Sequence, residues 1–254
     1  MVRLAFTFYL GSALSPIAAA IAREVGARVG MPVAFDPLAT DAVRHAALDQ
    51  PPAGILWLCG LDTVLRKDAG RLDASIVAAP VFPGRTRPVY DSVIVASERS
   101  AGSGLEALQG STLAINEPES WSGHHALRAH LAARGARRPM FGRIVVSGSH
   151  EASIDALLDG SADCAAIDDA VWAARAGRDP RTAALRVIDR TETWPAPPLS
   201  LVGRLDPGLA AAIAAALPDV SVPGLVAIAR ASDADYAVFR DGLAASRSLG
   251  WTSP

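Results

Sequence analysis

The feature that most constrains the fold of this chain is a repeated alternation of short apolar runs with longer helix-like segments. In the N-terminal part, apolar runs at residues 2–8, 32–35 and 54–58 are separated by helix-like segments at 16–29 and 41–48. Alternation of strands and helices is typical of α/β proteins, in which helices cover a mostly parallel sheet. We therefore expect an α/β fold with a mostly parallel sheet.

The order of these segments also predicts two lobes. A long β-branched run at residues 89–97 ends the first alternation, and the Pro-rich stretch 194–198 ends a second one. Two α/β blocks that are separated by two irregular connections indicate two lobes joined by two crossing strands. We expect a discontinuous first lobe, residues 1–93 and 190–254, and a second lobe formed by the insert 94–189.

The charge balance argues against several classes of partner. The sequence has 24 Lys and Arg, 26 Asp and Glu, and a formal net charge of −2, without a basic run. Nucleic acids and anionic membranes are bound by clustered positive charge, so we expect neither as a partner. No apolar stretch reaches the length of about 18 residues that a transmembrane helix needs, so we do not expect the chain to span a membrane.

The apolar start of the chain could be mistaken for a signal peptide. Arg3 supplies only a thin positive region, residues 6–9 are typical of a strand, and Pro16 suits the start of a helix. We therefore expect this segment to belong to the folded chain. Two locations stay open: the periplasm, if a leader has been removed, and otherwise the cytoplasm.

The cysteines and histidines do not form a metal-site pattern. Cys59 and Cys164 lie in apolar, strand-like runs, which predicts two buried free thiols rather than a disulfide or a reactive thiol. The spacing of His124, His125 and His130 loosely resembles metal ligands on one helical face, but no carboxylate or cysteine completes the set. We expect a solvated histidine face, no metal and no cofactor.

The strongest local feature is a polar turn at residues 116–125, between an apolar strand and a helix. In a parallel sheet such a turn lies at the carboxyl end of a strand, where α/β proteins bind ligands. Free N–H groups at the helix start, two hydroxyl groups and a glycine suit a carboxylate, phosphate or phosphonate. The alternative is a serine-capped surface loop. The candidate contacts are Ser120, Trp121, Ser122, Gly123 and His124.

Two further strand-to-helix turns are expected at the same edge of the sheet. His150 follows a Gly/Ser turn and could donate a hydrogen bond to an anionic oxygen. Asp168 follows the next strand and could accept a hydrogen bond from an amine or hydroxyl group of a ligand. The alternative for each residue is that it caps its own helix.

The equivalent edge of the first lobe supplies less specific candidates. Tyr9 follows the first strand, Cys59 and Gly60 follow the strand at 54–58, and Tyr90 opens the first crossing strand. The two tyrosines have the size and the hydroxyl group to close over a ligand. The alternative is that each is a core aromatic residue with a satisfied hydroxyl group.

Signatures of catalysis are weak. The sequence has no Gly-x-Ser-x-Gly elbow and no Walker loop, and the glycine turn at 102–104 is too short for a dinucleotide fingerprint. Asp168, His150 and a serine could imitate a triad, but helix capping explains the serines more simply. We therefore expect a protein that is not an enzyme.

Several motifs together resemble the phosphate-, phosphite- and phosphonate-type substrate-binding proteins of ABC importers. The turns that contain Ser122, His150 and Asp168 occur in the order and spacing of that family. The matching segments are 108–110, 120–124, 148–154, 160–168, 171–172, 235–236 and 249–251. The resemblance covers nearly the whole chain and is most specific between residues 108 and 172.

The resemblance implies a type II periplasmic-binding-protein fold, with a ligand in a cleft between two lobes and hinge closure around it. Ser120 and Ser122 match the anion-gripping serines of the family, and His150 matches a ligand-contacting histidine. Tyr9 and Tyr90 match positions at which the family places aromatic residues.

Three functions are compatible with these features. The first is a solute-binding protein, expected as a monomer, that captures a small anionic or zwitterionic ligand for the permease of an ABC importer. The others are a cytosolic enzyme or biosynthetic protein on the same fold, and a ligand-sensing domain of a regulator. Trp121 replaces a small polar residue often found in the ligand turn, which favours a ligand with an apolar or ring portion over phosphonate itself.

Overall fold

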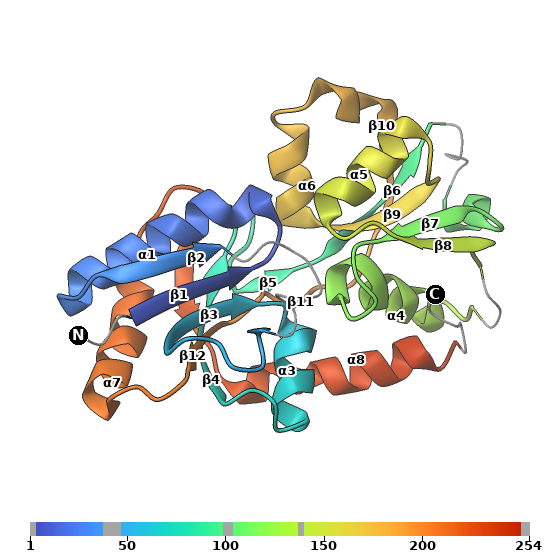
Figure 1. Ribbon diagram of the computed structural model, residues 1–254. Coiled ribbons are helices and arrows are strands. Elements are labelled where there is room, and N and C mark those ends of the chain that lie inside the picture. Colours follow the sequence, from blue (N-terminus) through green and yellow to red (C-terminus); the bar gives the residue numbers. More distant parts are fainter. Residues whose placement is uncertain (1–3, 38–46, 99–103, 137–139, 250–254) are drawn as a thin grey trace. The chain divides into compact units, whose positions relative to one another are not determined.

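The computed structural model describes residues 4–37, 47–98, 104–136 and 140–249, and the chain divides into two compact units (Figure 1). Unit 1 contains the described residues up to Val89 and those from Pro195 to Ala237. Unit 2 contains Tyr90–Trp194 and the described residues from Val238 onward. The chain therefore passes between the units after Val89, after Trp194 and again after Ala237.

Unit 1 contains a six-stranded sheet in the order β13-β4-β12-β3-β1-β2. Its strands are β1 (Leu4–Tyr9), β2 (Val33–Pro37), β3 (Gly54–Leu58), β4 (Ala74–Val81), β12 (Leu199–Val202) and β13 (Ala227–Arg230). β1 pairs in parallel with β2 and β3, as the alternation predicts. β12 is antiparallel to β3 and β4, and β13 is antiparallel to β4. The sheet is mixed because the strands added after the chain returns run against the first four.

The helices of unit 1 are α1 (Ser15–Val29), α3 (Gly60–Asp68) and α7 (Pro207–Ala216), with 3₁₀ turns at Ser12–Leu14, Leu217–Asp219 and Asp233–Tyr236. α1 packs on β1 and β2, and its fully buried residues Ala18, Ile21 and Val25 recur at helical spacing. Gly30 ends the helix with a left-handed φ of 69°. The helix expected at 41–48 falls almost entirely outside the described residues.

Unit 2 contains a five-stranded sheet in the order β10-β6-β9-β7-β8. Its strands are β6 (Ser92–Ser97), β7 (Thr112–Ile115), β8 (Arg143–Val146), β9 (Cys164–Asp168) and β10 (Leu185–Arg190). β7 is parallel to β8 and β9, whereas β6 is antiparallel to β9 and β10. A separate pair, β5 (Val89–Tyr90) and β11 (Trp194–Pro195), forms where the chain leaves unit 1 and returns to it.

The helices of unit 2 are α4 (Ala126–Ala133), α5 (His150–Asp159), α6 (Asp169–Ala176) and α8 (Val238–Arg247), with a π-helical turn at Trp121–His125 and 3₁₀ turns at Leu105–Leu108 and Pro180–Ala184. α8 lies alongside α4 and packs against it (Figure 1). Phe239 and Leu243 on its apolar face are buried. The prediction that the whole C-terminal part joins the first lobe is therefore wrong for α8, because this helix buries its apolar face in unit 2.

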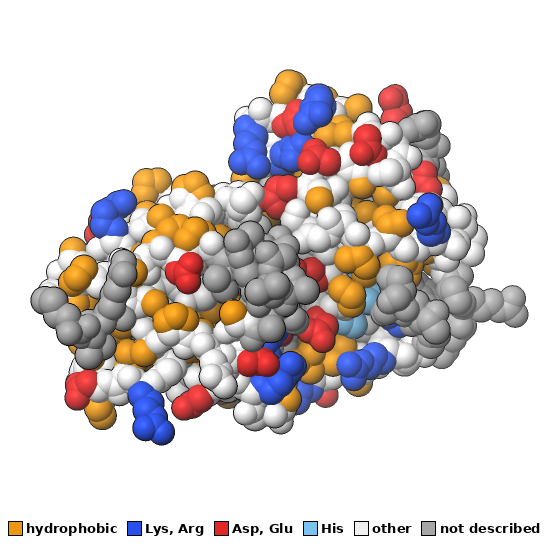
Figure 2. All heavy atoms as spheres, viewed as in Figure 1, with side chains coloured by type: hydrophobic (Ala, Val, Ile, Leu, Met, Phe, Trp, Pro, Cys, Tyr) orange, Lys and Arg blue, Asp and Glu red, His pale blue; other side chains and the backbone are white. Residues whose placement is uncertain are grey.

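The surface and the helix lengths bear on the expected partners. On the face shown in Figure 2, basic and acidic side chains are interspersed and do not gather into one large positive patch. Within the described ranges, no helix combines the length and the apolar character needed to cross a membrane. The first observation agrees with the near-neutral charge balance of the sequence.

Candidate ligand-binding site

Three strand-to-helix turns of unit 2 meet at one edge of its sheet. In the parallel strands β7 and β8, Ile115 lies beside Val146, and Ala114 of β7 lies beside Ala165 of β9. The carboxyl ends of these strands therefore face the same way, and the helical turn that begins at Trp121, helix α5 and helix α6 all start there. The structure thus places the three predicted turns at a common edge.

The first two turns are joined by hydrogen bonds. The Ser147 amide donates to the Ile115 carbonyl at 2.8 Å, and the Gly148 amide donates to the Asn116 carbonyl at 2.9 Å. Between the side chains, Ser122 Oγ lies 2.9 Å from His150 Nε2. The two turns therefore form one connected unit in which the predicted contacts Ser122 and His150 touch.

Gly123 is required by the closeness of this packing. A Cβ added at Gly123 would lie 1.8 Å from Asn116 Oδ1 and 3.1 Å from His150 Cε1. Only a residue without a side chain fits there, so the backbone of the helical turn comes close to both neighbours. The candidates Ser122, Gly123 and His150 therefore lie close together, next to Asn116.

His150 is neutral at physiological pH. The ring is buried, and burial lowers its pKa to about 4 although the nearby Glu151 carboxylate opposes this shift. A neutral imidazole has one donor and one acceptor nitrogen, so Nε2 can accept from the Ser122 hydroxyl or donate to it. In either case Ser122 and His150 can hydrogen-bond a ligand without contributing a full positive charge.

Ser120 and Asp168 cap the helices that follow them. Ser120 Oγ accepts from the Gly123 amide at 3.1 Å, and Asp168 Oδ1 accepts from the amides of Ala170 at 2.9 Å and Val171 at 3.2 Å. Burial and the neighbouring Asp169 raise the pKa of Asp168 to about 7, against the effect of these N–H groups. The capping alternative is thus realised for both residues, while the Ser120 hydroxyl can still donate to another acceptor.

The side chain of Trp121 belongs to the core of unit 2. It is fully buried, and its ring lies 4.2 Å from that of Trp194 and 5.1 Å from that of Phe239, centroid to centroid. Packing against α8 therefore accounts for the large residue at this position. The expectation that Trp121 marks a ligand with a ring portion is contradicted, because its ring is already covered by the protein.

The histidines on and before α4 are buried rather than solvated. His124 Nδ1 lies 2.6 Å from the Pro118 carbonyl, so this side chain stabilises the candidate turn 116–125 from its buried side. His125 Nδ1 lies 2.9 Å from Ser246 Oγ of α8, and burial, together with His124, lowers its pKa to about 3. The predicted solvated face is wrong because α8 covers His125 and the carboxylates of Asp189 and Glu192 cover His130.

The candidates of unit 1 lie at the carboxyl ends of β1 and β3. Tyr9 lies beside Leu58 in the sheet, and Cys59 and Gly60 follow at the start of α3. The Tyr9 ring is packed in an apolar cluster that includes Leu58, which agrees with the core alternative. Cys59 is partly exposed and forms no disulfide, and Gly60 is buried.

Two further observations complete the placement of the predicted residues. Tyr90, the second residue of β5, is buried and belongs to unit 2. Cys164 is buried, and neither cysteine forms a disulfide, as predicted, although Cys59 is not buried.

Sequence reasoning missed Asn116 as a candidate. Its Oδ1 is buried and has no hydrogen-bond partner among the described residues, directly beside Gly123. A buried polar atom without a partner is uncommon in folded proteins and often marks a place where a ligand or water binds. The available signal was its position as the first polar residue after an apolar strand.

Comparison with known proteins identifies the family. Residues 8–239 match the family of periplasmic substrate-binding proteins of phosphonate ABC transporters. The chain belongs to this family. Sequence comparison with curated proteins gives no significant match.

Solved structures show the fold of this phosphonate-family binding protein. PhnD1 from Prochlorococcus marinus, in complex with methylphosphonate, has a TM-score of 0.82 and 16% identity, over 97% of this chain and 99% of that one. A binding protein component of an ABC phosphonate transporter from Pseudomonas aeruginosa has a TM-score of 0.81 and 16% identity, over 98% of this chain and 87% of that one. The arginine-, lysine-, histidine-binding protein ArtJ from Geobacillus stearothermophilus has a TM-score of 0.57 and 17% identity, over 86% and 89% of the two chains.

The phosphonate-family protein therefore has the type II periplasmic-binding-protein fold, as the motifs predict. Its role is that of a solute-binding protein of an ABC importer family. The family assignment does not favour the alternatives, an enzyme on the same fold or a sensing domain of a regulator.

Proposed function

We propose that this protein binds a phosphonate or a closely related tetrahedral anion through the turns that contain Ser122 and His150. The observation that carries the proposal is the contact between these two side chains at an edge where three helices begin. Helix N-termini present free N–H groups and a partial positive charge, which suit an anionic ligand. The family match and the likeness to a methylphosphonate complex support the same ligand class.

Within this site each residue has a distinct part. The Ser122 and Ser120 hydroxyl groups and the first amides of the π-helical turn donate to the anionic oxygens, and His150 orients Ser122 or donates directly. Gly123 allows the backbone to approach the ligand. Oδ1 of Asn116, without a partner among the described residues, is an acceptor for a protonated oxygen of the ligand. Trp121 and His124 hold the turn in shape from its buried side.

Four further predicted contacts, Tyr9, Cys59, Gly60 and Tyr90, stay candidates on the family resemblance alone. Asp168 contributes mainly by capping α6, and its raised pKa near 7 leaves a fraction of protonated carboxyl groups that can donate to an anion.

The protein captures its ligand without transforming it and delivers it to a permease in the membrane from the periplasm. This proposal follows from membership of a transport family. A mixture of methylphosphonate and protein should give an unchanged ³¹P NMR spectrum after prolonged incubation. A new phosphate signal would instead revive the enzyme alternative.

A thermal-shift screen tests the ligand class. The probes are methylphosphonate, phosphite, phosphate, acetate and arginine. A ligand at a hundredfold excess over its Kd stabilises the folded state by about 2.7 kcal/mol, or roughly 5 to 10 °C for a chain of this size. We expect such a shift with at least one phosphorus oxyanion and none with arginine. A shift with arginine or acetate alone would contradict the proposal.

A further inference from the structure

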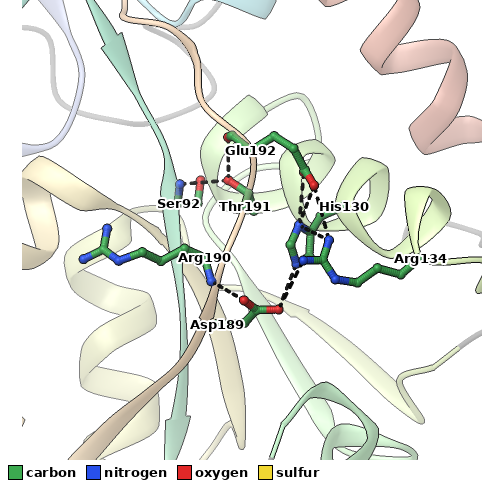
Figure 3. Close-up of polar contacts among 7 residues, drawn as sticks. All are labelled: Ser92, His130, Arg134, Asp189, Arg190, Thr191 and Glu192. Carbon is green, nitrogen blue, oxygen red and sulfur yellow. Dashed lines mark hydrogen bonds and ion pairs between the residues drawn. The ribbon is translucent and has the colours of Figure 1, made fainter. Parts of the chain in front are cut away.

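A buried histidine outside the candidate ligand turns connects two parts of unit 2. His130 lies on α4 and is fully buried. Its Nε2 lies 3.0 Å from Asp189 Oδ2, and its Nδ1 lies 3.0 Å from Glu192 Oε2. Figure 3 shows the ring facing both carboxylates, one from the end of β10 and one from the segment that follows it.

Arg134 competes with Glu192 for Nδ1 of His130. Arg134, one turn further along α4, places Nη1 2.8 Å from His130 Nδ1 and 3.2 Å from Glu192 Oε1 (Figure 3). Nδ1 therefore lies between a donor and an acceptor. Without a proton it accepts from Arg134, and with a proton it donates to Glu192, but it cannot do both at once.

The carboxylates supply a constant negative charge to this cluster. Burial alone would raise the pKa of Asp189 and of Glu192, but hydrogen bonds and the charges of His130 and Arg134 outweigh burial and hold both pKa values below the usual range. Arg190 contributes its backbone amide to Asp189, whereas its guanidinium pairs with Asp91.

The position of the cluster in the chain gives it a consequence for the ligand site. Asp189 and Glu192 flank Thr191, which exchanges hydrogen bonds with Ser92 of β6: the Thr191 amide donates to the Ser92 carbonyl, and the Ser92 amide donates to Thr191 Oγ1, both at 3.0 Å. This segment continues into β11, through which the chain returns to unit 1. α4, at the other side of the cluster, continues directly from the ligand turn at 120–125.

We propose that His130 is a positioning residue that fastens the return segment 189–192 to α4. Protonation of its Nδ1 changes the hydrogen-bond partner of this atom from Arg134 to Glu192. In the protonated form, His130 bridges both carboxylates directly with two charge-assisted hydrogen bonds, which are the stronger kind. In the neutral form, Glu192 is held only through Arg134, a half-exposed side chain. The return segment is therefore held more tightly at low pH. The effect on ligand affinity rests on the function proposed above, whereas the protonation exchange does not.

Amide hydrogen exchange of the ligand-free protein tests whether Nδ1 of His130 changes its hydrogen-bond partner with pH. Amide protection at residues 190–193, corrected for the intrinsic rate, is compared at pH 5.5 and pH 8.5. We expect at least threefold stronger protection at pH 5.5 in the wild type. His130→Gln keeps a donor to Asp189 and an acceptor for Arg134 but does not titrate, so its protection should not depend on pH. Glu192→Gln keeps an acceptor for Nδ1 but loses the charge, so the pH dependence should be smaller than in the wild type. The exposed Glu98→Gln should behave like the wild type.

Imidazole ¹⁵N NMR provides an independent measurement if a variant folds poorly. The His130 signal, assigned by its loss in His130→Gln, should show Nδ1 unprotonated at pH 8.5 and protonated at pH 5.5, with Nε2 protonated throughout. A nitrogen pattern that stays the same between these pH values would overturn the proposal, as would equal protection in the wild type and in His130→Gln.

Affinity for methylphosphonate separates this inference from the proposed function. His130→Gln should change the pH profile of Kd by about threefold or more while leaving the Kd at pH 8.5 near that of the wild type. Absence of methylphosphonate binding in the wild type would count against the proposed function, but the exchange and NMR results would still decide the role of His130.

Discussion

The indole ring of Trp121 lies directly against Gly242 of α8: a Cβ added at Gly242 would come within 2.4 Å of Cη2 of that ring. The same Cβ would lie 2.6 Å from the ring of Trp194. The helical turn that carries the candidate ligand contacts is thus seated on α8 through a contact that tolerates no side chain.

Gly242→Ala should therefore destabilise the protein. The methyl group overpacks a filled core, and such changes cost about 1–3 kcal/mol. Urea unfolding measures the effect. The cost should be smaller when measured in a Trp121→Leu background, because part of the clash is then removed. An equal cost in both backgrounds would show that the two residues are not coupled.

Gly123→Ala should weaken ligand binding. The added methyl group would displace Asn116 or His150, and a hydrogen bond to a charged ligand contributes about 1.5–3 kcal/mol, so Kd should rise about tenfold or more. Gly208→Ala, in the first turn of α7, is the matched control and should bind like the wild type. Isothermal titration with methylphosphonate measures both, and an unchanged Kd in Gly123→Ala would remove this turn from the site.

Asp168→Asn should remove a pH dependence of stability. Because the folded-state pKa is raised to about 7, the folded protein keeps a proton that the unfolded chain releases from about pH 4 upward. Stability contributed by this proton is present at low pH and is lost as pH rises towards 7. Asparagine caps a helix as well as aspartate does and stays neutral, so the variant should be more stable than the wild type at pH 8, by about 1–3 kcal/mol.

Denaturant unfolding at pH 5 and pH 8 measures this difference. The matched control is Asp206→Asn, which changes the exposed N-cap of α7 and should leave the pH dependence of the wild type in place. If Asp168→Asn loses stability at both pH values, the carboxylate is needed in its charged form and the expected sign is incorrect.

The two thiols should differ in reactivity. Cys164 is fully buried, and burial raises its pKa to about 12, whereas Cys59 is partly exposed. The thiolate is the reactive form, so iodoacetamide at pH 8 should modify Cys59 well before Cys164 in the folded protein. Mass spectrometry of labelled peptides measures the two rates, with the denatured protein as the control in which both react. Equal rates in the folded protein would contradict the burial of Cys164.

Much of this architecture could be predicted from local sequence patterns. The strand predicted at 54–58 has the observed bounds, and the turns before His150 and Asp168 lie at the predicted edge, because apolar runs and Gly/Ser turns are local signals. The proximity of Ser122 and His150 also follows from the order of strands and helices. Parallel strands that end together bring their following turns together.

Other features depend on contacts that local patterns do not encode. The apolar face of α8 shows that this helix must be buried, but not that its partner is α4. Once α8 is in place, the burial of His125 and the position of the Trp121 ring follow from it. The sequence also suggests that Asp168 is either a cap or a ligand contact, and only the positions of the Ala170 and Val171 amides show that it caps α6.

Isothermal titration of the ligand-free protein with methylphosphonate tests the proposed site most directly. We expect saturable binding of one ligand per chain in the wild type and in Ser75→Ala, an exposed control. Ser122→Ala should raise Kd about tenfold to a hundredfold, because it removes one hydrogen bond to a charged ligand, while unfolding stays cooperative with a midpoint lowered by the loss of the hydrogen bond to His150. Equal affinity of wild type and Ser122→Ala, or no heat with methylphosphonate, phosphite and phosphate from a folded wild-type protein, would contradict this site.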